Sequence, residues 1–290
     1  MIITTAEQLR NLTGSYYANN DFSKIENMVK AVEKELCITL NMQTLDNLTG
    51  DAKTAAQQAV AYMATMRFYK LNDISHENAG RKVKIDKENE ARPFEWQLAR
   101  DDRAHLEEYY RALDRLIDTL QGDSAFQQSK IYQRIQQLIV KDADTMNYLT
   151  GIDPSPWLFI RLVPFLAESQ RFVEKCFGTA FDENSFGGNE DLEHATQMAV
   201  AMGGVSLMGR RLSLQAMPYG LMKLFESDGG GNRQEAAALD RLDDYLKHLS
   251  KEQRYWIEEM KLKRDAAAGK ETITHLQMPE NEKNNKFMRV

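Results

Sequence analysis

The sequence has too few cysteines and too short an apolar run for several large classes of protein. Cys37 and Cys176 are the only thiols in 290 residues, too few for a disulfide framework. Both lie in apolar helical contexts, which favours two buried thiols in a reducing cytoplasm. The longest apolar stretch, 157–167, is interrupted by Arg161 and Pro164 and is shorter than the roughly 18 residues of a membrane span. The N-terminus lacks the basic start and apolar centre of a signal peptide.

Basic residues are also relatively few. The 37 lysines and arginines are outnumbered by 43 aspartates and glutamates, and the formal net charge is −6. Because phosphate backbones are held by Lys and Arg, this balance argues against a surface that grips nucleic acid, but not against nucleic acid passing nearby. Only six prolines interrupt long stretches rich in Ala, Glu, Lys, Leu, Arg and Gln. The fold class we expect is therefore mainly α.

The sequence contains no motif that carries a known chemistry. It has no phosphate loop, no G-x-G-x-x-G, no H-E-x-x-H and no C-x-x-C. Asp101 and Asp102, followed by His105, could place a carboxylate and an imidazole on one helix face. Acidic residues near a helix start are more often partners of the helix dipole. We expect no catalytic residue, no cofactor and no metal, and these three residues would be the first place to test for hidden activity.

Apolar residues recur at helical spacing along most of the chain. Ser155 is predicted to cap a helix whose first residue is Pro156, and Pro164 should kink or break that helix. Small residues within 192–211 predict close contact with another helix: Ala195, Ala199, Gly203 and Gly204. The expected helices are 21–40, 50–69, 98–120, 129–149, 156–177, 192–211, 234–249 and 251–267.

Short segments recur in the same order in the two halves, and each half reads helix, helix, short strand-like turn, helix. This order predicts one helical module duplicated and fused, with chance as the alternative because ALDRL is an easy helical pentapeptide. The matching segments are ALDRL at 112–116 and 238–242, VEK at 32–34 and 173–175, Leu71 with Leu212, and Gly80 with Gly220. The VEK copies are separated by 141 positions and the ALDRL copies by 126.

The repeat predicts how the chain divides. The two ends are too polar to fold alone and are expected to be extended arms. The predicted parts are an N-terminal arm (1–20), a first helical module (21–122), connecting helices that belong to neither copy (123–160), a second helical module (161–267) and a C-terminal arm (268–290).

Part of the chain resembles a known family. The matching segments are PFEW at 93–96, ALDRLIDTL at 112–120, SKIYQRIQQLIVKDADTMNYLTGI at 129–152, SPWLF at 155–159 and VEKCFG at 173–178. Through them, residues 88–178 resemble a family of helical proteins from phages and prophages of the Bacteroidetes. Each half separately resembles the small phage head–tail connector, or adaptor, fold. The chain is longer than such connectors and is duplicated.

The resemblance implies a structural virion protein of the phage neck, made in the host cytoplasm. Such a protein joins portal to tail at the head–tail junction, and double-stranded DNA passes through its lumen without specific binding. The implied partners are further copies in a homo-oligomeric ring, with a dodecamer as the expected form, the portal protein, and tail or further neck proteins. No membrane is involved. The alternatives are a tail-completion or minor capsid protein, and an intracellular helical adaptor of the host.

Lateral contacts between subunits need exposed apolar or unpaired backbone groups. A possible edge strand at 212–217 offers such groups, and the C-terminal arm carries further apolar residues. The expected interface residues are Leu212, Leu214, Met217, Tyr219, Leu276, Met278 and Phe287.

Overall fold

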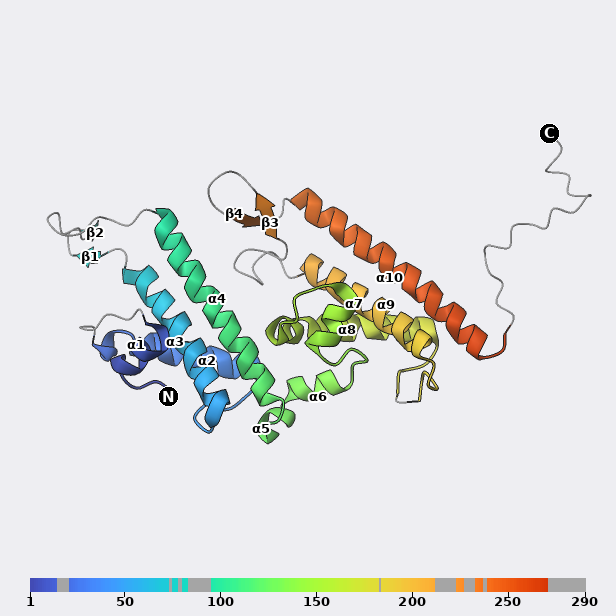
Figure 1. The fold of residues 1–290 in the computed structure, drawn as a ribbon, viewed down its shortest axis with the longest axis horizontal. Helices are drawn as coiled ribbons and strands as arrows, with labels where there is room; N and C mark the ends of the chain where they lie inside the picture. Colours follow the sequence, from blue (N-terminus) through green and yellow to red (C-terminus); the bar gives the residue numbers. More distant parts are fainter. Residues whose placement is uncertain are drawn as a thin grey trace, which may run out of the picture. The chain divides into compact units, whose positions relative to one another are not determined.

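The chain folds into two compact units, both mainly α-helical as the composition predicts (Figure 1). A computed structural model describes residues 1–14, 21–72, 75–77, 80–82, 95–182, 184–211, 223–226, 233–236 and 239–270. Unit 1 comprises Met1–Gln137, Lys141–Asp144 and Asp153–Arg161. Unit 2 comprises Leu138–Val140, Thr145–Ile152 and Leu162–Val290.

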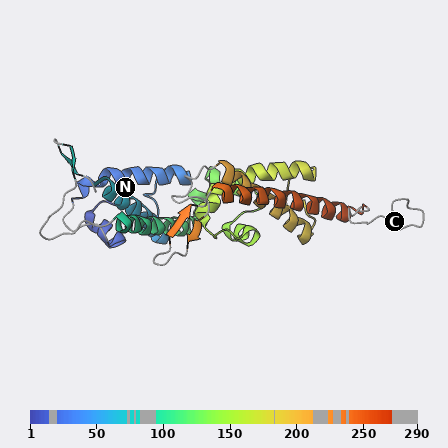
Figure 2. The same ribbon diagram turned by 90° about the horizontal axis from the view of Figure 1, so that it is seen from above.

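Unit 1 is built around one long buried helix, α3. Its elements are α1 (Ala6–Thr13), a 3-10 turn (Phe22–Lys24), α2 (Glu26–Leu40), α3 (Gly50–Asn72), the strands β1 (Ser75–Glu77) and β2 (Gly80–Lys82), α4 (Glu95–Leu120), α5 (Ser124–Gln127) and α6 (Lys130–Gln136). Helix α3 packs lengthwise on α4 and also contacts α1 and α2 (Figures 1 and 2). Alanines cover much of its surface, so three helices can approach it closely. β1 and β2 form an antiparallel hairpin with Ser75 opposite Lys82.

Unit 2 repeats this arrangement of elements. It contains most of α7 (Ala143–Thr150) and of α8 (Pro156–Phe177), then α9 (Glu190–Arg211), β3 (Lys223–Glu226), β4 (Arg233–Ala236) and α10 (Leu239–Ala267). Helix α9 packs lengthwise on α10, and β3 and β4 form a second antiparallel hairpin. Each unit therefore has two long antiparallel helices joined through a hairpin.

Small residues on α9 are required by its close contacts, as the sequence predicts. A Cβ atom placed on Gly204 would lie 2.6 Å from the Leu166 side chain, and one on Gly209 would lie 2.4 Å from Leu246. Such distances are well below van der Waals contact, so a larger residue would force the leucine side chain, or the helix that carries it, to move.

The central helices of the two units bury matching positions. Along 51–71 the order of buried, half-buried and exposed residues is repeated along 191–211, 140 positions later. The two patterns differ only at Thr54, which is exposed, and His194, which is half-buried. A match over this whole length is expected if α3 and α9 occupy the same place in two copies of one module.

The helices on either side of α3 and α9 also match. Helices α7 and α8 follow α1 and α2 by 137 positions, and α10 follows α4 by 144 positions. The matched buried pairs are Leu9 with Met146, Ile25 with Leu162, Val29 with Leu166, Val32 with Ser169, Leu36 with Val173, Leu113 with Ile257 and Leu116 with Met260. Both α1 and α7 end at a glycine with positive φ, Gly14 at +68° and Gly151 at +67°. The two units therefore repeat one arrangement of helices, and we refer to them below as its two copies.

The segment matches that predict the repeat are wrong in register. The VEK segments are 141 positions apart, four more than the 137 that relates α2 to α8. Four residues are about one helical turn, so the shifted match keeps the same apolar stripe. The ALDRL segments are not equivalent at all: Leu113 lies in the last third of α4, whereas Leu239 opens α10. Leu212 and Gly220 lie outside the described residues.

The predicted N-terminal arm is wrong for residues 1–14. Ile2, Ile3 and Leu9 are buried, and α1 packs against α3. Thr5 caps α1 in a capping box with Gln8, which starts a helix of only 8 residues in a polar sequence. Residues 15–20 lie outside the described residues.

The other predicted boundaries also change. The expected helix 129–149 is divided into α6 and α7, and residues 123–160 are shared between the two units. The expected helix 234–249 is wrong at its start, because 234–236 belong to β4, and the rest of it forms with the expected helix 251–267 the single helix α10, which begins at Leu239. Helix α10 ends where the C-terminal arm was predicted to begin, and residues 271–290 lie outside the described residues. Both cysteines are half-buried rather than fully buried.

The predicted start of α8 is confirmed. Pro156 is its first residue, and the Leu158 amide donates to the Ser155 hydroxyl at 3.1 Å. Asp114 on α4 strengthens this start, because it accepts hydrogen bonds from the Ser155 hydroxyl at 2.8 Å and the Trp157 amide at 2.9 Å. The helix continues through Pro164 instead of breaking there.

Replacing Leu9 by alanine should lower the free energy of unfolding by about 2–5 kcal/mol, because a fully buried side chain is removed from the contact of α1 with α3. Met146→Ala, at the matching position of α7, should cost a similar amount, and Asn11→Ala on the exposed side of α1 is the control. Urea unfolding measures all three. A Leu9→Ala protein as stable as the Asn11→Ala protein would show that α1 is not part of the core.

Candidate functional site

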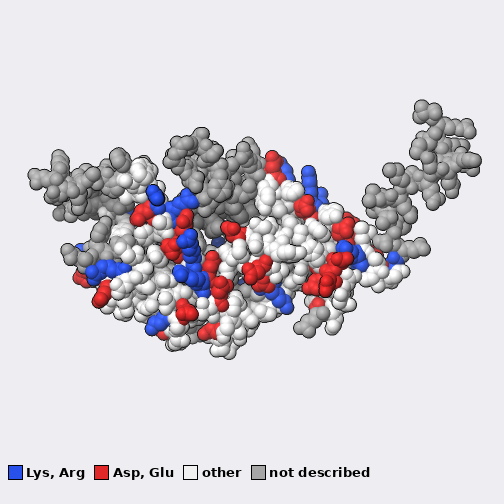
Figure 3. Space-filling model, in the orientation of Figure 1, with Lys and Arg blue, Asp and Glu red and all other residues white. Residues whose placement is uncertain are grey.

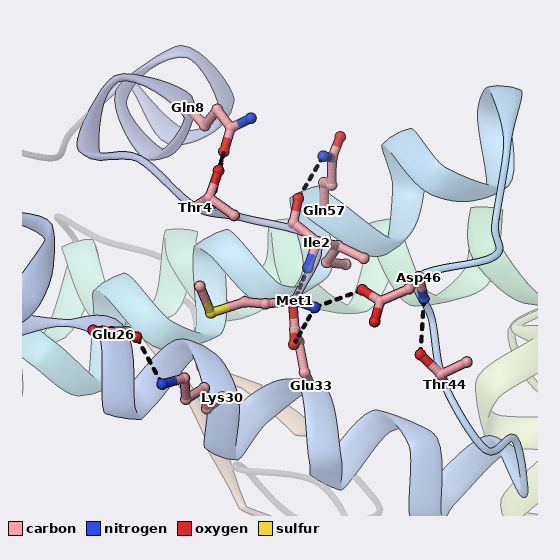
Figure 4. Close-up of polar contacts among 10 residues, drawn as sticks. All are labelled: Met1, Ile2, Thr4, Gln8, Glu26, Lys30, Glu33, Thr44, Asp46 and Gln57. Atoms are coloured by element: carbon pink, nitrogen blue, oxygen red, sulfur yellow. Dashed lines mark hydrogen bonds and ion pairs between the residues drawn. The ribbon is translucent and has the colours of Figure 1, made fainter.

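The first residues of the chain are held between α2 and α3 by their own backbone. The Ile2 amide donates to the Glu33 carboxylate on α2, and the Ile2 carbonyl accepts from the Gln57 side chain on α3 at 2.7 Å (Figure 4). Ile2 is almost fully buried, so both of its polar backbone groups need partners. A carboxylate on one helix and an amide on the other supply them.

The second unit contains the same arrangement. The Ile139 amide donates to the Gln170 carbonyl oxygen on α8 at 3.0 Å, and the Ile139 carbonyl accepts from Gln197 on α9 at 3.4 Å. Ile139 and Gln170 follow Ile2 and Glu33 by 137 positions, and Gln197 follows Gln57 by 140. The same register that matches burial therefore matches a specific set of hydrogen bonds. We call each arrangement the backbone anchor of its unit.

A cavity of about 330 Å³ lies beside the anchor of unit 1, between α2 and the loop that follows it. Glu33 and Asp46 on its wall both interact with the Met1 amine (Figure 4). Burial raises the pKa of the Glu33 carboxyl, opposed by the hydrogen bond from Ile2. The hydrogen bond from Met1 lowers the pKa of Asp46. These carboxylates hold the first residues in place and are already occupied by that task.

Each unit carries one bidentate ion pair across the equivalent helix pair, but on different turns. In unit 1, Arg67 on α3 donates to both carboxylate oxygens of Glu35 on α2, at 2.8 and 2.7 Å. The matching positions of unit 2 are apolar, Phe172 and Leu207.

One helical turn away, the charged pair lies in unit 2 and the matching residues of unit 1 are apolar. There Arg211 on α9 donates to both carboxylate oxygens of Glu168 on α8. The matching positions of unit 1 are Ala31 and Leu71. The two copies therefore share a core and differ in where their surface is charged and where it is apolar.

Four aromatic residues form a connected surface on unit 2, which we call the aromatic patch. It consists of Tyr148 from α7, His194 from α9, and Tyr255 and Trp256 from α10. The His194 ring centroid lies 6.2 Å from Tyr148 and 5.7 Å from Trp256, and the rings of Tyr255 and Trp256 are 5.2 Å apart. Tyr148 and Tyr255 are 80% and 56% exposed.

The residues proposed for hidden chemistry have structural partners. His105 is buried, and its ring contacts those of Tyr62 and Tyr69 edge to face. The Asp101 carbonyl lies 3.1 Å from His105 Nδ1. Asp102 pairs with Lys70 on α3 at 3.2 Å. These residues lie well inside α4, which begins at Glu95, so they are not partners of its N-terminal dipole.

The expected interface residues all lie outside the described residues: Leu212, Leu214, Met217, Tyr219, Leu276, Met278 and Phe287. The anchors and the aromatic patch were missed. A signal for the anchors exists in the sequence, because Leu-Thr-Gly closes both α1 and α7, at 12–14 and 149–151. The same tripeptide also occurs at 48–50, in a different structural role.

Comparison with protein-family models, with curated protein sequences and with solved structures finds no match to this chain. Within the described residues, no helix is both long enough and apolar enough to cross a membrane.

Replacing Gln57 by leucine should lower the free energy of unfolding by about 1–3 kcal/mol, because the buried Ile2 carbonyl loses its partner. Gln197→Leu should act in the same direction through Ile139. The control is Gln58→Met. Met198 occupies the matching position of unit 2, so this residue is compatible with the fold. Urea unfolding measures the three. If Gln57→Leu is no more harmful than the control, the anchor does not stabilise unit 1.

The Glu35–Arg67 pair should make stability depend on pH. The hydrogen bond from Arg67 lowers the pKa of Glu35 below its ordinary value of 4.5 in the folded chain. A lowered carboxyl pKa contributes stability above the unfolded pKa, and that contribution is lost as pH falls through the folded pKa. Glu35→Gln should therefore cost about 0.2–1 kcal/mol at pH 7, as expected for a solvent-exposed pair.

The difference between Glu35→Gln and the parent protein should shrink as pH falls below 4.5, because the parent carboxyl becomes protonated as pH passes its lowered pKa. Urea unfolding from pH 7 to pH 3 measures it, with Arg67→Leu as the second arm of a double-mutant cycle. An equal difference at both ends of this range would show that the charged pair is not the cause.

Proposed function

We propose that the protein is a non-enzymatic structural part of the phage neck, a head–tail connector that assembles into a homo-oligomeric ring between portal and tail. In this role its partners are further copies of itself, the portal, and tail or other neck proteins. Double-stranded DNA passes through the lumen without specific binding. The proposal rests on the resemblance carried by residues 88–178 and on how the surfaces of the two units differ.

The difference between the units is the observation that supports the proposal most. Large apolar side chains are exposed at positions where the other copy is polar: Ile38 (69%) matches Lys175, Leu71 (60%) matches Arg211, Phe172 (52%) matches Glu35, and Tyr148 (80%) matches Asn11. Exposed apolar groups of this kind are available for contacts with other molecules. Two copies that keep one core but expose different apolar groups suit an assembly part with several dissimilar neighbours.

The charge balance is compatible with a DNA channel. A net charge of −6 leaves no general attraction for phosphate backbones. A lumen through which DNA moves must not hold it, so an acidic or neutral wall is suitable.

The purified chain should form a closed ring, seen as one large species by light scattering after size exclusion and as rings by electron microscopy. Phe172→Glu and Leu71→Arg each place on one unit the residue found at the matching position of the other. Because both remove exposed apolar surface, they should shift the chain towards monomer. The control is Asn11→Ala, a change at an exposed polar position.

Localisation separates the possible structural roles. Antibody labelling of particles should place the protein at the head–tail junction. A strictly monomeric protein that is absent from virions would overturn the proposal. Labelling along the tail or over the capsid would instead support a tail-completion or minor capsid role.

A further inference from the structure

The aromatic patch of unit 2 is specific to that copy of the module. At the matching positions unit 1 has Asn11, Thr54, Arg111 and Ala112, none of them aromatic. The core of the module therefore does not require aromatic residues here. Exposed tyrosines next to a tryptophan and a histidine are typical of surfaces that bind a partner chain.

Acidic side chains border the aromatic patch. The first turn of α9, directly before His194, carries Glu190, Asp191 and Glu193. Asp191 is 83% exposed and lies 3.5 Å from Lys263 of α10. Figure 3 shows acidic side chains gathered over the start of α9 and the adjoining part of α10. Aromatic rings beside carboxylates suit a ligand that carries both positive charge and an apolar side chain.

The end of this chain has that chemistry. Its last eight residues, KNNKFMRV at 283–290, include Lys283, Lys286 and Arg289, no aspartate or glutamate, and the adjacent pair Phe287 and Met288. A phenylalanine can pack edge to face against tyrosine rings, and a methionine sulfur makes favourable contacts with aromatic rings.

The length of the chain allows the segment to return to the patch. Trp256 precedes the end of α10 at Ala267 by 11 residues, which corresponds to about 17 Å of helix. A flexible linker with the length of the 12 residues from 271 to 282 would span about 20 Å. A linker that matches the distance it must cover gives an effective concentration in the millimolar range.

We propose that residues 283–290 dock on the aromatic patch of their own unit 2. Phe287 packs against Tyr148 and Tyr255, and the three cationic side chains face the carboxylates at the start of α9. The inference does not depend on the role of the protein in a phage neck.

Photo-crosslinking in the full chain tests the docking. Phe287→p-benzoylphenylalanine keeps an aromatic side chain at the position and, on irradiation, should form an intramolecular cross-link to α7, α9 or α10 near the patch, identified by mass spectrometry. Tyr148→Asn combined with Tyr255→Arg introduces the residues of unit 1 and should lower the yield about tenfold or more, since two contact aromatics are lost. Because both tyrosines are exposed, the fold should survive, as thermal unfolding would verify.

Two further tests distinguish specific docking on the aromatic patch from nonspecific contacts with exposed apolar side chains. Trp96→Asp removes an exposed aromatic residue that lies in unit 1, outside the patch, and should leave the yield unchanged. Reversing the charges with Lys283→Glu, Lys286→Glu and Arg289→Glu should lower the yield, as should added salt in the parent protein. Cross-links outside the patch, or an unchanged yield in the double tyrosine variant, would overturn the proposal. A cross-linked dimer would overturn the intramolecular docking and assign the patch to a contact with a second copy.

Discussion

The structure depends on a short segment outside regular secondary structure that is held between two helices in each unit. A buried residue outside regular secondary structure must satisfy both of its polar backbone groups, because water cannot reach them. At the buried Ile2 a carboxylate and an amide on neighbouring helices supply the partners, and at the half-buried Ile139 two amides do so. In each unit the two partners lie on different helices. Ile2 therefore fixes the packing of α2 on α3, and Ile139 fixes the packing of α8 on α9. The short helices α1 and α7 follow directly and are placed by the same bonds.

Closeness to the core explains which parts of the two copies match and which differ. The central helices α3 and α9 must accommodate similar neighbours, so the order of buried and exposed residues along them is repeated almost without change. Positions on the outer face have no such constraint. There an ion pair in one unit corresponds to an apolar pair in the other, as with Glu35–Arg67 and the matching Phe172 and Leu207. Because exposed ion pairs contribute little to stability, this exchange alters what the surface can bind more than how well the module folds.

Helical periodicity made the fold class and a repeated order of helices predictable, but not the register of the repeat. Any match displaced by one turn keeps the same apolar stripe, and the two VEK segments are displaced in this way. The start of α8 was predictable because Ser155 and Pro156 signal it locally. Helix α1 was not, because its 8 residues are mostly polar and only Leu9 is buried. Its stability comes from contacts with α3, which no local pattern in 1–14 reveals.

Duplication within one chain has a consequence for the proposed ring. When single modules form a ring, every lateral contact is the same by symmetry. When the repeating part is a chain of two unlike modules, the two modules need not make the same contacts. Exposed groups present in only one copy, such as Phe172 and Leu71, can then each serve a single kind of contact. Such a part can meet unlike neighbours above, below and beside it while it keeps one core, and the exposed apolar groups of the two copies differ as this requires.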